Sequence, residues 1–267
     1  MKRALPVVLL LLILQTMALS VPQRIVSTMP SITETLFALG LDNQVVGVTE
    51  NCNYPQSAAG KDKVGRETVN LEKVISLKPD LVLMLLDAQR PEVEKLKRFN
   101  LPVVTVNPHG VEEVIKAIKE IGEITGTSAR AEEIVSDIKA RLEKVKRKVA
   151  GRPNPKVFIV VGYRPLITAG RDTFIDDILR LAGGENIARR AKSPYPQWSF
   201  ETLLKTDPEV IVILDGVVEQ REVLNDKRWS TLKAVRNHRI VFIDPDIISR
   251  PGPRVINAIE LLAESFK

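Results

Sequence analysis

The fold is decided by the stretch Ser128-Ala-Arg-Ala-Glu-Glu-Ile-Val-Ser-Asp-Ile-Lys-Ala-Arg-Leu-Glu-Lys-Val-Lys-Arg-Lys-Val149. Its apolar residues recur every three or four positions, which predicts one long helix with a single apolar face. The other faces are rich in lysine and arginine, and we interpret them as solvated. Gly151-Arg-Pro-Asn-Pro155 follows and ends the helix.

On either side of this helix, short apolar runs alternate with helical patterns, which predicts parallel sheets covered by helices. We therefore predict an α/β fold of two αβ lobes with central, mostly parallel sheets, joined by one long α-helix. The lobes are expected at residues 21–126 and 152–267, with the helix at 127–151. The strands are predicted at Ile25–Ser27, Val45–Thr49, Leu81–Leu86 and Val103–Val106, and at Val157–Gly162, Val210–Leu214 and Ile240–Ile243.

The two halves repeat one local pattern. Asn70-Leu-Glu72 and Ser199-Phe-Glu201 each place a capping residue before a helix and a glutamate at its second position, ahead of an apolar strand. Ser31-Ile-Thr-Glu34 is predicted to be a capping box, and Asp172-Thr173 is predicted to open a helix over Phe174–Leu181. Two similar lobes on a rigid spacer predict a cleft, and open αβ sheets bind ligands beyond the carboxyl ends of their strands.

The first twenty residues have the pattern of a secretory signal peptide. Lys2 and Arg3 precede the apolar run Ala4–Leu14, and Ala18-Leu-Ser20 has the small residues of a cleavage site. The run is short for a bilayer span, and an uncleaved anchor is the alternative. No cysteine lies near the cleavage point, so we expect a periplasmic or secreted protein without a lipid anchor, beginning near Val21.

The composition excludes several classes of protein. Hydrophobic residues make up 44% and charged residues 27% of the 267 positions, which excludes a disordered chain and a multi-span membrane protein. The net charge of +6 comes without a dense basic patch, which argues against a nucleic-acid partner. One cysteine and two histidines are too few for a Cys/His metal site, so no metal is expected. Cys52 has no partner in the chain for a disulfide.

The sequence carries no recognisable catalytic motif. No G-x-S-x-G elbow, P-loop, G-x-G-x-x-G or H-E-x-x-H is present, and His109 and His238 occupy turn-like contexts. We therefore assign no catalytic residue. An acid–base pair of carboxylates stays open as the enzymatic alternative, whereas a nitrogenase-like metallocluster protein would need several cysteines.

Several motifs carry a resemblance to a known family. They are Arg24-Ile-Val-Ser-Thr-Met-Pro-Ser-Ile-Thr-Glu34, Cys52-Asn-Tyr-Pro55, Val64-Gly65, Ala182-Gly-Gly-Glu-Asn-Ile187, Tyr195-Pro-Gln197 and Arg250-Pro-Gly-Pro-Arg254. The chain resembles the substrate-binding proteins of ABC importers for cobalamin, haem and iron–siderophores. The resemblance implies a monomeric, non-enzymatic protein without a cofactor, which captures a small molecule between two lobes and delivers it to a membrane permease dimer. The second and fifth motifs are closest to the cobalamin-binding branch, so cobalamin or a related corrinoid is the expected ligand.

The resemblance also implies a ligand site in the cleft. From the first lobe it would include Pro30, Ser31, Asn51, Tyr54 and Arg66; from the second it would include Gly162, Tyr163, Tyr195, Asp246, Ile247, Ile248, Ser249 and Arg250. A well-known cobalamin binder of the family has aromatic residues where Asn51, Arg66, Ile247 and Ile248 stand here, and this chain lacks its second-lobe disulfide.

The position of Arg66 bears on haem. Haem binders of this class supply a tyrosine oxygen to the iron from that position. A guanidinium cannot coordinate iron, although it can pair with a carboxylate or a phosphate. Cobalamin is therefore the expected ligand rather than haem. A ferric siderophore or haem is the alternative.

Glu72 and Glu201 are implied by the resemblance to dock onto arginines of the permease, one glutamate from each lobe. An acid in the first turn of a helix also stabilises that helix by about 0.3–1 kcal/mol, which alone would explain either residue. Their equivalent placement in both lobes suits a partner with two-fold symmetry.

Overall fold

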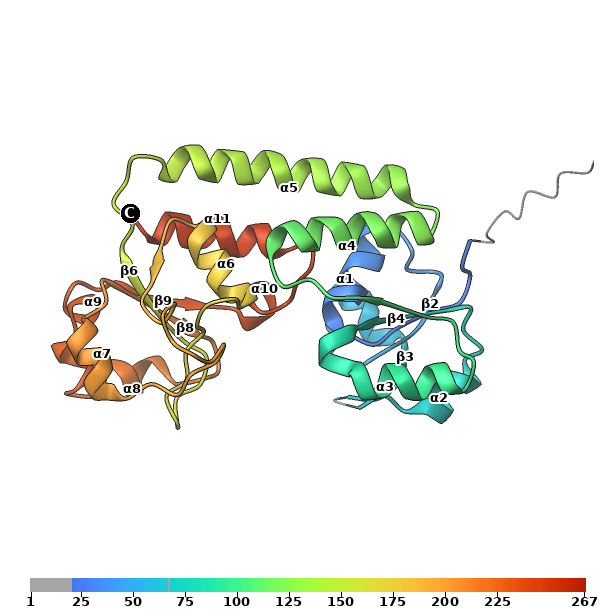
Figure 1. The fold of residues 1–267 in the computed structure, drawn as a ribbon, viewed down its shortest axis with the longest axis horizontal. Coiled ribbons are helices and arrows are strands. Elements are labelled where there is room, and N and C mark those ends of the chain that lie inside the picture. Colours follow the sequence, from blue (N-terminus) through green and yellow to red (C-terminus); the bar gives the residue numbers. More distant parts are fainter. Residues whose placement is uncertain (1–20, 67) are drawn as a thin grey trace, which may run out of the picture.

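The computed structural model describes residues 21–66 and 68–267. Two parallel sheets form the centres of two lobes, and the long helix α5 (Ser128–Val149) lies across both lobes on one side of the molecule (Figure 1). This is the predicted fold class. The predicted lobe boundaries fall in the connections on either side of α5 and stay a prediction as domain limits. The predicted signal peptide, residues 1–20, lies outside the described residues.

The first lobe contains a five-stranded parallel sheet in the order β3-β2-β1-β4-β5. Every residue of the apolar strand β4 is buried, because helices cover both faces of a parallel sheet. The strands are β1 (Ile25–Ser27), β2 (Val45–Val48), β3 (Asp62–Lys63), β4 (Leu81–Leu85) and β5 (Val103–Val106). The helices are α1 (Pro30–Ala38), α2 (Leu71–Ser76), α3 (Leu86–Arg98) and α4 (Val111–Ile124), with a short 3₁₀-helix at Gln56–Gly60.

The second lobe contains a four-stranded parallel sheet in the order β7-β6-β8-β9. The strands are β6 (Lys156–Val160), β7 (Glu185–Asn186), β8 (Val210–Leu214) and β9 (Ile240–Ile243). The helices are α6 (Phe174–Leu181), α7 (Phe200–Thr206), α8 (Gln220–Asn225), α9 (Lys233–Arg236), α10 (Pro245–Ile248) and α11 (Val255–Ser265), with a 3₁₀-helix at Trp229–Thr231. All seven predicted strands are present. The edge strands β3 and β7 were missed because two residues show no periodicity.

Helix α5 packs its apolar face on α4 and α11 (Figure 1). Of the predicted apolar face, Ile138 and Val145 are buried there together with Val135. Ile134, Leu142 and Val149 complete that face and pack, partly buried, at the edge of the core. Arg141 also fixes α5 to α11, because its Nε and Nη2 atoms donate to the carboxylate of Glu260 at 2.9 and 2.6 Å. This pairing lowers the pKa of Glu260.

Helix α1 departs from the prediction at its start. Ser31 was expected to cap the helix, but the helix begins at Pro30 with Met29 in the cap position, and no side chain caps it. Proline suits the first helical position because its fixed φ angle matches the helix and it has no N–H to satisfy. The glutamate of the predicted capping box, Glu34, instead reaches the second lobe.

The other predicted helix starts are confirmed. Thr173 caps α6, Asn70 caps α2 and Ser199 caps α7, each accepting a hydrogen bond from the backbone N–H three residues further on. Cys52 lies in the loop that follows β2 and is buried, with its Sγ atom 3.1 Å from the hydroxyls of both Thr33 and Thr49.

Candidate ligand site between the lobes

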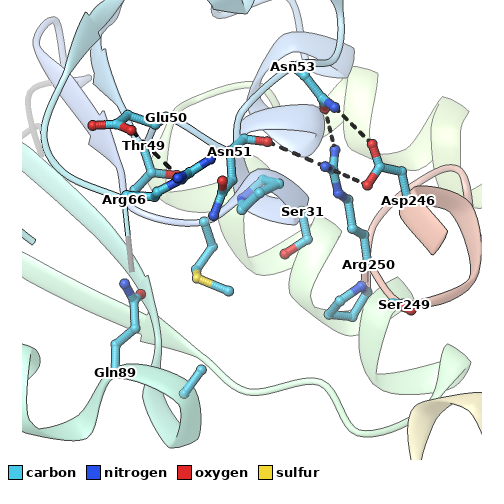
Figure 2. A pocket seen from close by; sticks show the side chains of 14 residues that line it. Ser31, Thr49, Glu50, Asn51, Asn53, Arg66, Gln89, Asp246, Ser249 and Arg250 are labelled. Carbon is cyan, nitrogen blue, oxygen red and sulfur yellow. Dashed lines mark hydrogen bonds and ion pairs between the residues drawn. The ribbon is translucent and has the colours of Figure 1, made fainter. Parts of the chain in front are cut away.

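A cavity of about 640 Å³ lies between the two lobes, next to α1 and α10 (Figure 2). Its walls are formed by the segments that follow β1, β2, β4 and β9, so the carboxyl ends of strands from both sheets face it. This is the edge at which open αβ sheets bind ligands. The lining residues are Met29, Pro30, Ser31, Thr49, Glu50, Asn51, Asn53, Arg66, Ala88, Gln89, Asp246, Ser249, Arg250 and Pro251.

A cluster of charged side chains joins the lobes beside this cavity. We call Glu34, Arg250 and Arg254 the interlobe ion cluster. Arg254 donates from Nε and Nη2 to the two oxygens of the buried Glu34 carboxylate at 2.8 and 2.6 Å, and Arg250 Nη1 donates to Glu34 Oε1 at 2.9 Å. The hydrogen bonds that the Glu34 carboxylate accepts from Arg254 raise the pKa of Arg254. The guanidinium of Arg254 also lies 4.0 Å from the ring centre of Tyr54, a cation–π contact.

Arg250 forms one wall of the cavity, and its charge is already balanced there. Its Nη1 atom donates to Asn53 Oδ1 at 2.7 Å, and its Nη2 atom lies 2.7 Å from Asp246 Oδ1 (Figure 2). Asn53 Nδ2 donates to the other oxygen of Asp246 at 2.9 Å. Arg250 therefore holds the lobes together and offers little free positive charge to a ligand.

The opposite rim is looser. Arg66 Nε lies 3.8 Å from Glu50 Oε2, and both side chains are exposed, so this pair is weak. Gln89 is buried at the floor and held by Thr28, whose hydroxyl donates to Gln89 Oε1 at 2.6 Å. The lining has two carboxylates and two guanidiniums, so its formal charge is balanced, and the remaining polar groups are amides and hydroxyls.

Seven of the thirteen residues predicted for the ligand site line this cavity; they are Pro30, Ser31, Asn51, Arg66, Asp246, Ser249 and Arg250. Their contact with a ligand stays a prediction. Glu50, Asn53 and Gln89 also line the cavity, and they were not predicted as site residues. Each is a polar residue just beyond the carboxyl end of a strand, and that signal was available in the sequence.

The other predicted residues lie elsewhere. Ile248 is fully buried at 0% exposure in the core, so it does not face the cavity as expected, and Ile247 packs against the same core. Gly162 pairs with Ile167 in a backbone bridge, and the ring of Tyr163 packs on Trp229 with 6.2 Å between the two ring centres. Tyr195 is exposed on the second lobe, outside the cavity lining.

The two helices with the predicted docking glutamates are equivalent in detail. Glu72 in α2 and Glu201 in α7 are the second residues of their helices, and both helices lie on the side of the molecule away from α5 (Figure 1). Each helix also exposes an aliphatic residue three positions later, Ile75 at 42% and Leu204 at 41%. The surroundings of the two glutamates differ in that Glu201 forms an ion pair of 2.7 Å with Lys205.

Within residues 21–66 and 68–267, no three His, Cys, Asp or Glu residues gather closely enough to hold a metal ion. The same part of the chain contains no helix that is both long and apolar enough to cross a bilayer.

Two lobes of parallel sheet, a stiff helix across them and a polar cavity between facing strand ends define a two-lobed solute-binding protein. The chain belongs to the periplasmic binding protein family, whose model matches residues 25–247. The predicted resemblance is thereby confirmed. Because members of this family bind solutes and are not enzymes, the prediction of a binding protein holds as well.

Known proteins place the chain more closely. It is 40% identical to YvrC of Bacillus subtilis (strain 168), an uncharacterized ABC transporter substrate-binding lipoprotein, over 92% of this chain and 80% of the relative. The structure of the periplasmic vitamin B12 binding protein BtuF of Vibrio cholerae is similar with a TM-score of 0.83 at 25% identity, covering 92% of this chain and 97% of that one. A periplasmic haem-binding protein from Pseudomonas aeruginosa has a TM-score of 0.82 at 28% identity, with 92% of each chain covered.

The chain is thus an extracytoplasmic substrate-binding protein of an ABC transporter, in the class that serves vitamin B12, haem and iron–siderophores. A small-molecule ligand and a membrane permease partner follow from that class. The expectation of a protein without a lipid anchor concerns residues outside the described part, and the Bacillus relative is a lipoprotein.

Proposed function

We propose that the chain binds cobalamin or a related corrinoid in the interlobe cavity. The observation that carries this proposal is the character of the lining, which combines balanced charge with amide and hydroxyl groups. A corrin ring carries neutral amide side chains that both donate and accept hydrogen bonds, and such groups match this lining. The likeness to the vitamin B12 binding protein of Vibrio cholerae supports the same ligand.

Haem fits the lining less well. No tyrosine or histidine of the described chain lines the cavity, and of the usual axial ligands only the thioether of Met29 does. An anionic ferric siderophore is the second candidate, because the loosely paired Arg66 guanidinium is free to reorient toward an anionic oxygen of the chelate.

Calorimetric titration of the purified protein with cyanocobalamin, haemin and ferric enterobactin decides among these ligands. We expect a one-to-one complex with cyanocobalamin and much weaker binding of the other two. Tight binding of ferric enterobactin with no cyanocobalamin binding at tens of micromolar would transfer the assignment to the siderophore.

We further propose that α2 and α7 form the docking surface for the permease, with one glutamate and one exposed aliphatic residue from each lobe. Glu72 and Glu201 would pair with basic groups of the permease, and Ile75 and Leu204 would pack beside those pairs. The duplicated placement supports a partner of two identical halves, since each lobe presents the same short pattern to one half. The receptor would act as a monomer.

The docking proposal is tested by exchanging both glutamates for arginine. The Glu72→Arg/Glu201→Arg protein is expected to bind its ligand normally and to lose association with the importer in nanodiscs, because two attractions become repulsions. Glu→Gln at both sites is the control for the change in helix stability. Full association and ligand delivery by the double-arginine protein would disprove docking through these helices.

The aliphatic pair has its own matched control. Ile75→Ser with Leu204→Ser is expected to weaken importer association without changing ligand affinity. Phe99 and Leu261 are also exposed apolar residues, one in each lobe and outside α2 and α7, so their replacement by serine should leave association unchanged. If both double variants lost association to the same extent, the loss would come from making the surface more polar anywhere and not from contacts of Ile75 and Leu204 with the importer.

A further inference from the structure

The first turn of α1 forms part of the cavity wall and leaves hydrogen-bond donors unused. Met29, Pro30 and Ser31 all line the cavity, and the helix extends nine residues from Pro30 to Ala38. The first backbone N–H groups of a helix have no partner within it, and here no side chain caps them. Because proline has no N–H, the unused backbone donors are those of Ser31 and Ile32, at the positive end of the helix dipole.

The Ser31 side chain is an independent sign of a binding site. It is only 2% exposed, yet its hydroxyl has no hydrogen-bond partner among the described residues. A buried hydroxyl without a partner lowers the stability of a folded protein, so such a group calls for an explanation. Its place in the cavity lining supplies one, because a bound molecule would meet it there (Figure 2).

The second lobe helps to enclose this hydroxyl. A Cβ atom added at Gly252 would lie 3.2 Å from the backbone oxygen and 3.7 Å from the Cβ atom of Ser31, so the loop after α10 runs close against the start of α1. Glu34, the acidic residue further along α1, directs its carboxylate to Arg250 and Arg254. The donors at the helix start are therefore enclosed by both lobes and are not neutralised by the acid of their own helix.

We infer that the Ser31 hydroxyl and the first turn of α1 bind an acceptor oxygen of the ligand. In a corrinoid this oxygen belongs either to the phosphate of the nucleotide loop or to an amide carbonyl of the ring. Helix N-termini bind phosphate oxygens through the same combination of free N–H groups and dipole. The inference rests on the proposed function only in its choice of corrinoids as probes.

Ser31→Ala tests the inference, with Thr168→Val as the matched control. Thr168 is also a fully buried residue whose hydroxyl lacks a partner among the described residues, but it does not line the cavity. Without ligand, Ser31→Ala should unfold at the same temperature as wild type or higher, because it removes an unsatisfied group. With ligand it should show a smaller rise in Tm than wild type. If the hydroxyl had only a structural role, Ser31→Ala would unfold at a lower temperature than wild type in the absence of ligand.

Two corrinoids distinguish the sources of the oxygen. Cyanocobalamin has the nucleotide loop and its phosphate, and cobinamide lacks both. Loss of a bond to a charged oxygen weakens binding by more than about tenfold, and loss of a bond to a neutral carbonyl by about two- to twelvefold. A large loss for cyanocobalamin alone assigns the phosphate, and a moderate loss for both probes assigns a ring carbonyl.

The outcomes that overturn the inference are separate from those that overturn the proposed ligand. If wild type binds cyanocobalamin and Ser31→Ala changes the affinity of neither corrinoid by more than about twofold, the inference is wrong and the ligand assignment stands. If wild type binds haemin or ferric enterobactin instead, the ligand assignment is wrong, and the same twofold criterion is applied with that probe. A wild-type protein that binds none of these probes refutes both.

Discussion

Replacing Glu34 by glutamine tests whether the interlobe ion cluster stabilises the protein. Arg250 would keep Asp246 and Asn53 as partners, so the weakening of its bond to position 34 costs little stability. Apart from the side chain at position 34, Arg254 has the ring of Tyr54 as a neighbour, and its own side chain is only 17% exposed. The change therefore replaces the two hydrogen bonds that Arg254 donates to a carboxylate by one to a neutral amide oxygen, and it leaves a largely buried cation without a carboxylate. We expect a loss of about 2–4 kcal/mol in the free energy of unfolding.

For a chain of this size, that loss lowers Tm by about 4–16 °C. Thermal unfolding followed by circular dichroism measures it. Glu133→Gln is the matched control, because Glu133 pairs with Arg130 at 2.7 Å on the exposed face of α5. An exposed pair of that kind contributes at most about 1 kcal/mol. If Glu34→Gln melts within about 2 °C of wild type, the ion cluster does not stabilise the contact between the lobes and the reasoning is wrong.

Three further predictions concern helix caps, pH and haem. Asn70→Ala and Ser199→Ala should each lower the unfolding free energy by about 1 kcal/mol, measured by urea unfolding, with ligand affinity unchanged; a loss of affinity would contradict a purely local role. Arg141 lowers the pKa of Glu260 in the folded protein. The ion pair therefore stabilises the fold fully at pH values above about 4.3, the pKa of an unfolded glutamate, and this contribution is lost as the pH falls through the lowered pKa. Wild type should therefore lose more Tm between pH 5 and pH 3 than Arg141→Gln does, and identical curves would show that the pair contributes nothing. With Arg66 at the position where haem binders have tyrosine, haemin should bind weakly and without a tyrosinate charge-transfer band, and a stoichiometric complex with that band would refute this.

The fold could be predicted from the sequence because its signals are long and local. The apolar stripe of α5 runs from Ile134 to Val149, over about four helical turns, and the strands of both lobes are unbroken aliphatic runs. The strands β3 and β7 could not be predicted, since a strand of two residues is defined only by the neighbour with which it pairs.

The candidate site was only partly predictable, because it depends on contacts between distant segments. The role of Glu34 could not be read locally, since Ser31 and Glu34 have the spacing of a capping box, whereas the carboxylate binds arginines more than 200 positions away. Ile248 illustrates the same difficulty, because a motif places a residue in a loop but does not say which of its side chains turn inward.

Cys52 has a practical consequence for measuring the ligand. It is the one cysteine of the sequence, and it is buried between Thr33 and Thr49. A maleimide dye therefore cannot reach a thiol on the folded protein, and a single cysteine introduced at Arg66 or Tyr195 would be the one labelled position. Both side chains are exposed, so a fluorophore attached there would sit at the cavity rim or on the face of the second lobe. The natural chain therefore needs no thiol removed before labelling, and the attached fluorophore would report the binding of a ligand that has no colour of its own.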